Sequence, residues 1–131
     1  MADPNKQDDE VLRFFLDNID SVPELEALLL LWQHRPNSWT ISDLSKRLYI
    51  DPEQTRNILQ GLSRKQFIFD DEARSGSYRY QSDSEQRDEL IGRAEKMYRR
   101  EIVRISTLIH SKPSRAIRDF ADAFRFTKEK P

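Results

Sequence analysis

The sequence predicts a mainly helical protein with one small β-hairpin. Leucine, isoleucine and phenylalanine recur at steps of three and four residues along much of the chain, as they do on the buried face of an amphipathic helix. Residues 67–81 depart from this spacing, because two short β-type runs there flank a loop that contains a glycine. Apolar residues make up 37% of the chain and charged residues 34%, so we expect a folded protein with thin helical layers and much surface.

Two helices are expected in the first part of the chain. Residues 1–9 are polar and are expected to fray, and residues 11–19 then give a short helix with a wide apolar face. Residues 21–24, Ser-Val-Pro-Glu, form a capping box with a proline in the first turn, which predicts a second helix over residues 23–34. Pro36 ends that helix, because the residue before a proline is pushed out of helical dihedral angles.

A pair of helices joined by a tight turn follows. Residues 39–40 are a short extended piece, and their threonine opens a capping box for a helix over residues 41–48. Residues 49–50 form a brief turn, after which Asp51 caps a helix that begins at Pro52. The expected buried stripe of this last helix consists of Thr55, Ile58, Leu59 and Leu62.

One long helix and one short helix are expected after the hairpin. Apolar residues recur at helical steps from Ser82 to about His110 without an intervening proline. At ~1.5 Å per residue this helix would be roughly 40 Å long, which is more than a small domain covers. Residues 112–113, Lys-Pro, end it, and a last amphipathic helix is expected around residues 117–124. The helix can pack along its own domain or pair with a second chain, and its length favours pairing.

The order of elements over residues 23–81 resembles that of the winged helix-turn-helix domain, and within this class it is most similar to MarR-type transcription regulators. The matching segments are residues 24–32, 39–48, 50–62 and 65–68. The sequence departs from the family's usual pattern at Gln66, where a glycine is common, and at Thr55, where a hydrophobic residue is common. The resemblance implies a DNA-binding transcription regulator.

A domain of this kind places the helix from Pro52 in the major groove, with the preceding helix as its brace. Amides suit bidentate contacts to adenine and guanidinium groups suit guanine or phosphate. The hairpin loop, residues 73–79, would contact the DNA backbone. The residues expected to contact DNA are Gln54, Arg56, Asn57, Gln60 and Arg64 of the helix, with Arg74 and Arg79 of the hairpin.

Charge distribution leaves a second interpretation open. The net charge is −5 over residues 1–36, +1 over residues 37–81 and +3 over residues 82–131, which weakly favours a polyanionic partner for the later parts. The isoelectric point near 6.1 argues against indiscriminate DNA binding. Three acids, residues 70–72, stand beside Arg74 and could pair with it or repel DNA. The alternative is therefore a winged-helix adaptor that binds another protein without sequence-specific DNA binding.

The sequence offers no visible catalytic or metal site. It has no cysteine, its two histidines, His34 and His110, fall in different expected elements, and its three glycines form no phosphate-binding loop. We therefore expect neither an enzyme nor a cofactor. The longest apolar run, residues 27–32, falls well short of the ~20 residues of a membrane span, so a soluble cytoplasmic protein without membrane contact is expected.

These observations divide the chain into three regions. Residues 1–20 are expected to be an N-terminal helical arm, residues 21–81 the winged helix-turn-helix domain, and residues 82–131 a helical dimerisation region. A homodimer through the first helix and residues 84–126 would suit a DNA reader, because symmetric half-sites require a symmetric protein.

Overall fold

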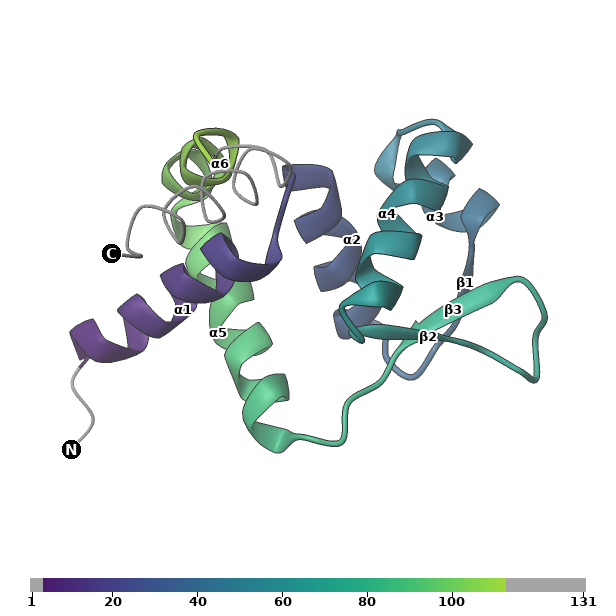
Figure 1. Cartoon of the computed structure of the whole chain (residues 1–131), viewed down its shortest axis with the longest axis horizontal. Helices are drawn as coiled ribbons and strands as arrows, with labels where there is room; N and C mark the ends of the chain where they lie inside the picture. Colours follow the sequence, from purple (N-terminus) through teal and green to yellow (C-terminus); the bar gives the residue numbers. More distant parts are fainter. Residues whose placement is uncertain (1–3, 113–131) are drawn as a thin grey trace, which may run out of the picture.

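The computed structural model describes residues 4–112 of the chain. The helix expected around residues 117–124 lies outside the described residues. From the first helix to the hairpin the elements follow the order that the sequence predicts, and the hairpin extends away from the helices (Figure 1). The elements are α1 (Pro4–Asn18), α2 (Val22–Gln33), β1 (Trp39–Thr40), α3 (Ile41–Leu48), α4 (Pro52–Arg64), β2 (Ile68–Asp70), β3 (Ser77–Tyr80), α5 (Glu85–Arg100) and α6 (Ile102–His110).

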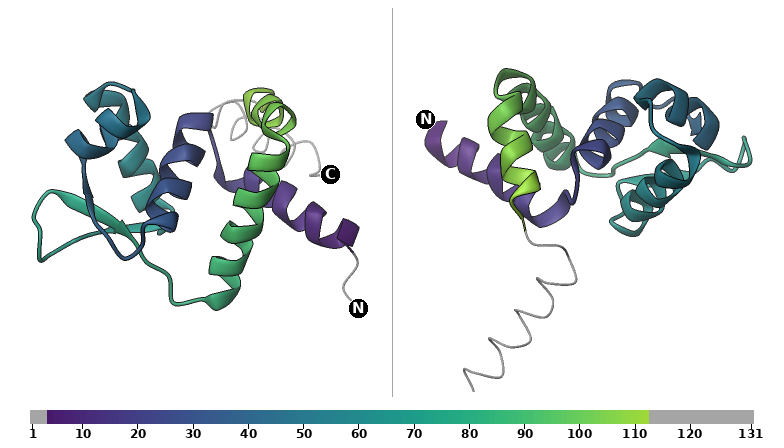
Figure 2. Two further views of the ribbon diagram at one scale, coloured as in Figure 1. Left: turned by 180° about the vertical axis from the view of Figure 1, so that it is seen from behind. Right: turned by 90° about the horizontal axis from the view of Figure 1, so that it is seen from above.

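Helix α2 lies at the centre and is shared by two groups of elements. Helices α1, α5 and α6 gather on one side of it, while α3, α4 and the strands lie on the other (Figures 1 and 2). Leucines occupy four consecutive positions of α2, residues 28–31, and all four are buried. A helix that is apolar around most of its circumference must be covered on several sides, which explains its central place.

The predicted starts of three helices, α2, α3 and α4, are confirmed. The side chains of Ser21, Thr40 and Asp51 each accept a hydrogen bond from the backbone N–H three residues later, at 3.2, 3.0 and 2.8 Å. A cap of this kind contributes ~1 kcal/mol. Helix α5 is capped by Ser84, whose hydroxyl accepts from the N–H of Arg87 at 3.1 Å.

The strands form a small antiparallel sheet in the order β1-β3-β2. Trp39 of β1 pairs with Tyr78, and Ile68 of β2 pairs with Tyr80, so both neighbours share β3. Gly76 ends the connecting loop with φ +81°, a conformation that glycine adopts without steric cost. The hairpin expected over residues 67–81 is therefore confirmed.

The expectation of one continuous helix from Ser82 to His110 is wrong. The chain leaves helical geometry at Glu101 (φ −130°, ψ 51°), so that two shorter helices replace the expected rod. The carboxylate of Glu101 accepts hydrogen bonds from Arg104 and Arg100, which lower its pKa, at 2.8 and 3.2 Å. The bend brings α6 onto α1 and α2 and buries Ile105, which a straight helix would have carried away from this core.

The first helix is also longer than expected, because it begins at Pro4 and not near Val11. Its buried residues include Val11, Phe14 and Phe15, as the apolar spacing predicts. Lys112 is the last described residue. Its ammonium group donates hydrogen bonds to the carbonyls of Phe15 and Ile19, at the C-terminal end of α1. A cation beside these carbonyls is favourable, since they form the negative end of the helix dipole.

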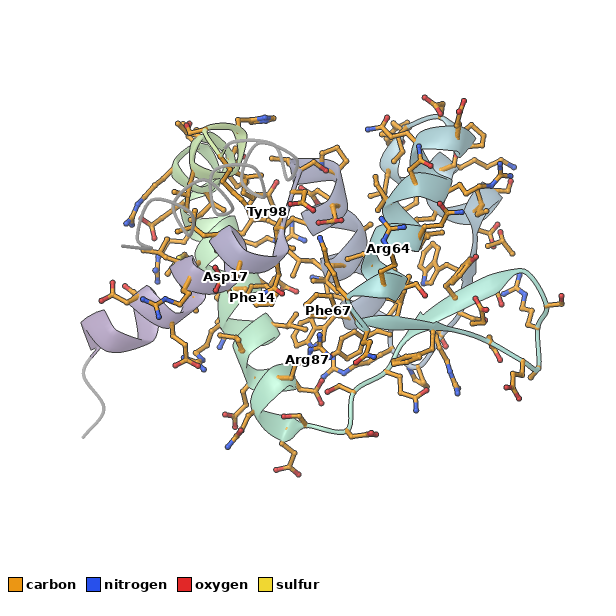
Figure 3. All side chains as sticks on the ribbon, in the orientation of Figure 1. Phe14, Asp17, Arg64, Phe67, Arg87 and Tyr98 are labelled. Carbon is orange, nitrogen blue, oxygen red and sulfur yellow. The ribbon has the colours of Figure 1, made fainter. Side chains whose placement is uncertain are left out.

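A single arginine joins α5 to the turn between α4 and β2. The guanidinium of Arg87 donates to the carbonyls of Lys65 and Gln66 at 3.1 and 3.0 Å. It also lies 4.0 Å from the centre of the Phe67 ring, whose edge meets Phe14 of α1 with ring centres 5.9 Å apart (Figure 3). Arg87 of α5 and Phe14 of α1 thus both contact the turn between α4 and β2, so two helices fix its position.

Two buried tyrosines add further links to α5. Tyr98 donates from its hydroxyl to Glu26 of α2 at 2.6 Å, and burial together with this hydrogen bond raises the pKa of Tyr98 to about 12. Tyr80 of β3 donates to Asp88 at 2.5 Å, and its pKa is raised mainly by burial. Both phenols therefore act as neutral hydrogen-bond donors.

Gln66 adopts a left-handed backbone with φ +65°, where the resemblance places a glycine. We expect Gln66→Gly to stabilise the protein by roughly 0.5–1 kcal/mol, because a side chain at positive φ is sterically strained and glycine is not. The matched control is Gln60→Gly in the middle of α4, which should destabilise by ~1 kcal/mol. Urea unfolding measures both, and a destabilising Gln66→Gly would contradict this assignment of strain.

Candidate nucleic-acid interface

Helix α4 has a buried side and an exposed side. The predicted stripe is confirmed, since Thr55, Leu59 and Leu62 are completely buried and Ile58 nearly so. The hydroxyl of Thr55 donates to the carbonyl of Asp51 at 2.9 Å, which satisfies its polar group in a position usually taken by a hydrophobic residue. The five polar residues expected at the DNA are all exposed: Gln54, Arg56, Asn57, Gln60 and Arg64.

The N-terminal end of α4 is fixed by the tight turn from α3. The hydroxyl of Ser45 donates to the carbonyl of Ile50 at 2.8 Å, and the N–H of Ile50 donates back to the carbonyl of Ser45 at 3.2 Å. Tyr49 lies between them in the left-handed region, with φ 58° and ψ 42°. This reciprocal pair closes the turn, so that the first turn of α4 begins at a defined angle to α3.

The C-terminal end of α4 is held by a buried ion cluster. The ammonium of Lys65 lies 2.8 Å from Glu24 in the first turn of α2, 3.0 Å from Asp20 in the connection before it, and 2.5 Å from the carbonyl of Asn18 at the end of α1. The side chains of Lys65 and Glu24 are only 13% and 7% exposed. Gly61 faces the same carboxylate, and a Cβ at this position would lie 3.1 Å from Glu24 Oε2. The absence of a side chain there allows α4 and α2 to approach closely.

A hollow of about 490 Å³ separates the outer face of α4 from the start of α2. Gln54, Asn57 and Arg64 line it together, so the structure brings these three expected DNA contacts to one place. Asp20 and Glu24 line it as well, and Lys65 offsets their charge. Figure 3 labels Arg64 on this helix. Arg56 and Gln60 are exposed on α4 outside this hollow.

The two hairpin arginines lie in different surroundings. Arg74 is exposed in the loop, where its guanidinium is 3.6 Å from Asp43 of α3 and 3.5 Å from the carbonyl of Ser38. Arg79 was expected in the loop but lies in β3, is half-buried, and its Nε has no hydrogen-bond partner among the described residues. Arg79 shares a hollow with the acids of residues 70–72. Of the two hairpin arginines, only Arg74 is therefore exposed.

One of the loop acids has a structural role that sequence reasoning missed. The carboxylate of Asp71 accepts from the N–H of Ala73 at 3.0 Å, and the N–H of Asp71 donates to the carbonyl of Ser77 at 2.9 Å. Such an Asx turn fixes the loop that carries Arg74. The signal for it was the Asp-x-Ala-Arg-Ser-Gly order itself, which is typical of a turn.

A second, wider hollow of about 990 Å³ lies between α3 and the hairpin loop. Its lining includes Lys46 and Arg47, which are exposed in the last turn of α3, together with Tyr49 and Arg74. Sequence reasoning missed Lys46, Arg47 and Tyr49 as surface features. Two consecutive bases directly before the tight turn were the available signal.

A separate apolar surface lies on α1 and α6. A hollow of about 370 Å³ is lined mainly by apolar surface from Leu12, Leu16 and Leu108. Ile102 and Val103, at the start of the same helix α6, are 48% and 78% exposed. Exposed apolar groups on neighbouring elements are typical of a surface that another molecule covers.

Residues 4–112 contain neither a grouping of metal ligands nor a membrane-spanning helix. Among residues 4–112, no three histidine or acidic side chains are grouped so that they could hold a metal ion. Within the same range, no helix combines the length and apolar character that crossing a membrane requires.

Comparison with solved structures confirms the winged-helix fold. The crystal structure of MepR, a transcription regulator of the Staphylococcus aureus multidrug efflux pump MepA, aligns with a TM-score of 0.52 at 17% identity, covering 95% of this chain and 87% of that one. The heme sensor protein PefR from Streptococcus agalactiae, solved with heme, gives 0.50 at 16% identity, covering 97% and 92%. The adhesin competence repressor AdcR from Streptococcus pyogenes gives 0.48 at 14% identity, covering 98% and 97%.

No protein-family model and no curated protein matches the sequence. The solved structures are therefore similar to this chain in fold. Their fold is that of MarR-type regulators, the class whose order of elements residues 23–81 resemble.

Removal of the Lys65 ammonium tests the ion cluster. We expect Lys65→Met to destabilise the protein by about 3–5 kcal/mol, because the carboxylate of Glu24 would remain buried without its cation. The double variant Lys65→Met/Glu24→Leu should recover much of this loss, since the carboxylate that remains, Asp20, belongs to a side chain that is 36% exposed and stays hydrated. Lys46→Met, at an exposed lysine, is the control and should change little. Denaturant unfolding that finds Lys65→Met as stable as the wild type would rule out this role for the cluster.

Proposed function

We propose that the protein is a transcription regulator that binds duplex DNA and reads the major groove with α4. The observation that supports this most is the exposed set of amide and guanidinium groups on α4, on a helix whose two ends are fixed. Gln54, Asn57 and Gln60 lie within two turns of one another, about the length that a major groove admits. The name of MepR as a transcription regulator supports the same class of function.

Each group on α4 has a chemical role in this proposal. The amides of Gln54 and Asn57 pair with adenine edges, where a side-chain amide both accepts and donates. Arg56 and Arg64 contact guanine edges or phosphates, and Gln60 adds a further amide. Ion pairing of Lys65 with Glu24 limits the repulsion that a nearby carboxylate exerts on phosphate.

The hairpin loop contacts the DNA backbone through Arg74. Its ion pair with Asp43 joins two side chains that are each at least half exposed, and such pairs contribute little in water. A phosphate can therefore replace Asp43 as the partner of Arg74 at small cost. Arg79 takes a lesser part, because it lies in the strand beside the acids of residues 70–72.

The DNA-binding form is a homodimer through α1 and residues 84–126. The exposed apolar groups of α1 and α6 support this, since Leu16, Ile102 and Val103 lie in this region and face solvent in the single chain. Two-fold symmetry places two copies of α4 on two half-sites of one duplex.

A protein-binding adaptor is the alternative function. The observation that favours it is the outer side of the hairpin, where Phe69 is 42% exposed next to the acids of residues 70–72. An aromatic side chain among carboxylates suits a basic protein surface better than it suits DNA.

Base reading and backbone contact give different responses to substitution. With a preferred duplex obtained by selection from a random pool, Asn57→Ala or Gln54→Ala should cost ~1–3 kcal/mol and should hardly affect random DNA. Arg74→Ala should weaken binding to both and reduce the salt slope by about one. Gln33→Ala, at an exposed glutamine at the end of α2, is the matched control. Fluorescence anisotropy over a range of salt concentrations measures all of them.

Two results would favour the adaptor. One is a wild-type protein that binds no DNA at ~150 mM salt, which is close to physiological ionic strength. The other is unchanged DNA binding in all three variants. Pull-down with the intact protein and with Phe69→Ala would then identify a partner that depends on the hairpin.

Val103 provides a clean test of the dimer. We expect the wild type to be a dimer at tens of micromolar, and Val103→Asp to be a monomer, because a carboxylate would be buried in an apolar interface. Val103 is 78% exposed in the single chain, so the substitution should leave the fold intact. Multi-angle light scattering gives the mass, with Gln33→Asp as the control. A monomeric wild type, or a Val103→Asp variant that stays dimeric, contradicts the proposed interface.

A further inference from the structure

Tyr49, in the turn between α3 and α4, combines two unfavourable features. Its side chain is 94% exposed, so its aromatic ring is almost entirely in water. Its backbone is in the left-handed region, with φ 58° and ψ 42°. Glycine and asparagine are the residues that usually occupy this region at the end of a helix, because a larger side chain is strained there.

The turn itself does not require a tyrosine. It is closed by backbone groups and by Ser45, which exchanges hydrogen bonds with Ile50. The N–H of Tyr49 donates to the carbonyl of Ser45, a contact that any residue other than proline makes. A glycine would therefore form the same turn without strain. A strained and exposed residue that the fold does not need indicates a function.

The surroundings of Tyr49 are basic. It lines the hollow between α3 and the hairpin together with Lys46, Arg47 and Arg74. Asp43 is the one carboxylate among the described residues that line this hollow, and it is paired with Arg74. Lys46 and Arg47 are exposed, and none of their contacts within the described residues is an ion pair. The hollow thus offers positive charge beside a free phenol.

We infer that Tyr49, with Lys46 and Arg47, forms a second contact of the protein with duplex DNA and binds a phosphate group beside the groove that α4 enters. This inference rests on the proposed function and adds a contact surface to it. The Tyr49 hydroxyl donates a hydrogen bond to a phosphate oxygen, and the two cations supply the attraction. Because these residues lie directly before α4, the contact sets how that helix meets the bases.

Duplex DNA fits this surface better than a protein partner does. The exposed groups that are not paired with the hollow's one carboxylate are two cations and a hydroxyl donor, which match the oxygens of a sugar-phosphate backbone. Phosphate contacts carry no sequence information, so the contribution of Tyr49 should be the same for every duplex.

Three substitutions of Tyr49 test the inference. Tyr49→Gly and Tyr49→Asn remove the phenol and suit the left-handed backbone, so they should unfold at the same temperature as the wild type or higher. Both should bind the preferred duplex and random DNA about tenfold more weakly, which corresponds to ~1.4 kcal/mol. Tyr49→Phe keeps the ring but not the hydroxyl and should lose as much affinity as Tyr49→Gly. None of the three should change the salt slope, because no charge is removed.

The two cations are tested in the same assay. Lys46→Ala and Arg47→Ala should each weaken binding to all duplexes and reduce the salt slope by about one. Gln33→Ala, which is distant in sequence and not part of this surface, should change neither affinity nor slope.

The outcomes separate this inference from the proposed function. If the wild type binds DNA and Tyr49→Gly binds equally tightly, the inference is wrong and the proposed function stands. A Tyr49→Phe variant that binds like the wild type rules out the phosphate hydrogen bond. A loss confined to the preferred duplex would mean a base contact and would also overturn it. If the wild type binds no DNA, the proposed function fails and this inference fails with it.

Discussion

Everything that α4 presents to solvent depends on how its C-terminal end is held. Lys65 ties this end to the start of α2 through Glu24 and Asp20, and Arg87 of α5 binds the next two carbonyls. The two attachments come from two different helices, α2 and α5, so the orientation of α4 is tied to both. A rigid scaffold of this kind is what base reading requires, because side chains must reach their partners within fractions of an ångström.

The ion cluster and the exposed charges have opposite roles. Inside, Lys65 pairs with the carboxylates of Glu24 and Asp20, and the exposure of its side chain is only 13%. Outside, the pair of Arg74 with Asp43 is solvated and easily exchanged. An acidic chain can in this way carry a DNA-binding face, since the position and pairing of its charges matter more than its net charge of −1.

The sequence predicts most of the elements because their signals are local. The residues that determine the caps at Thr40 and Asp51 are only a few positions from the helices they start. The same is true of the apolar stripe of α4 and of the hairpin. The bend at Glu101 was missed because neither proline nor glycine marks it and the packing of α6 on α1 decides it. Likewise, nothing near Lys65 reveals Glu24 as its partner, which is 41 residues away in the chain. The exposed face of α4 follows from periodicity, but the surroundings of each arginine do not.

The central claim is that α4 and the hairpin loop form the surface that meets DNA. Amide NMR spectra of the intact protein, recorded with increasing amounts of a selected duplex at ~150 mM salt, test it most directly. The account predicts the largest changes in residues 52–64 and 73–76, and small changes in residues 102–110 at the proposed dimer surface. Changes centred on α1 and α6, with α4 unaffected, would contradict it.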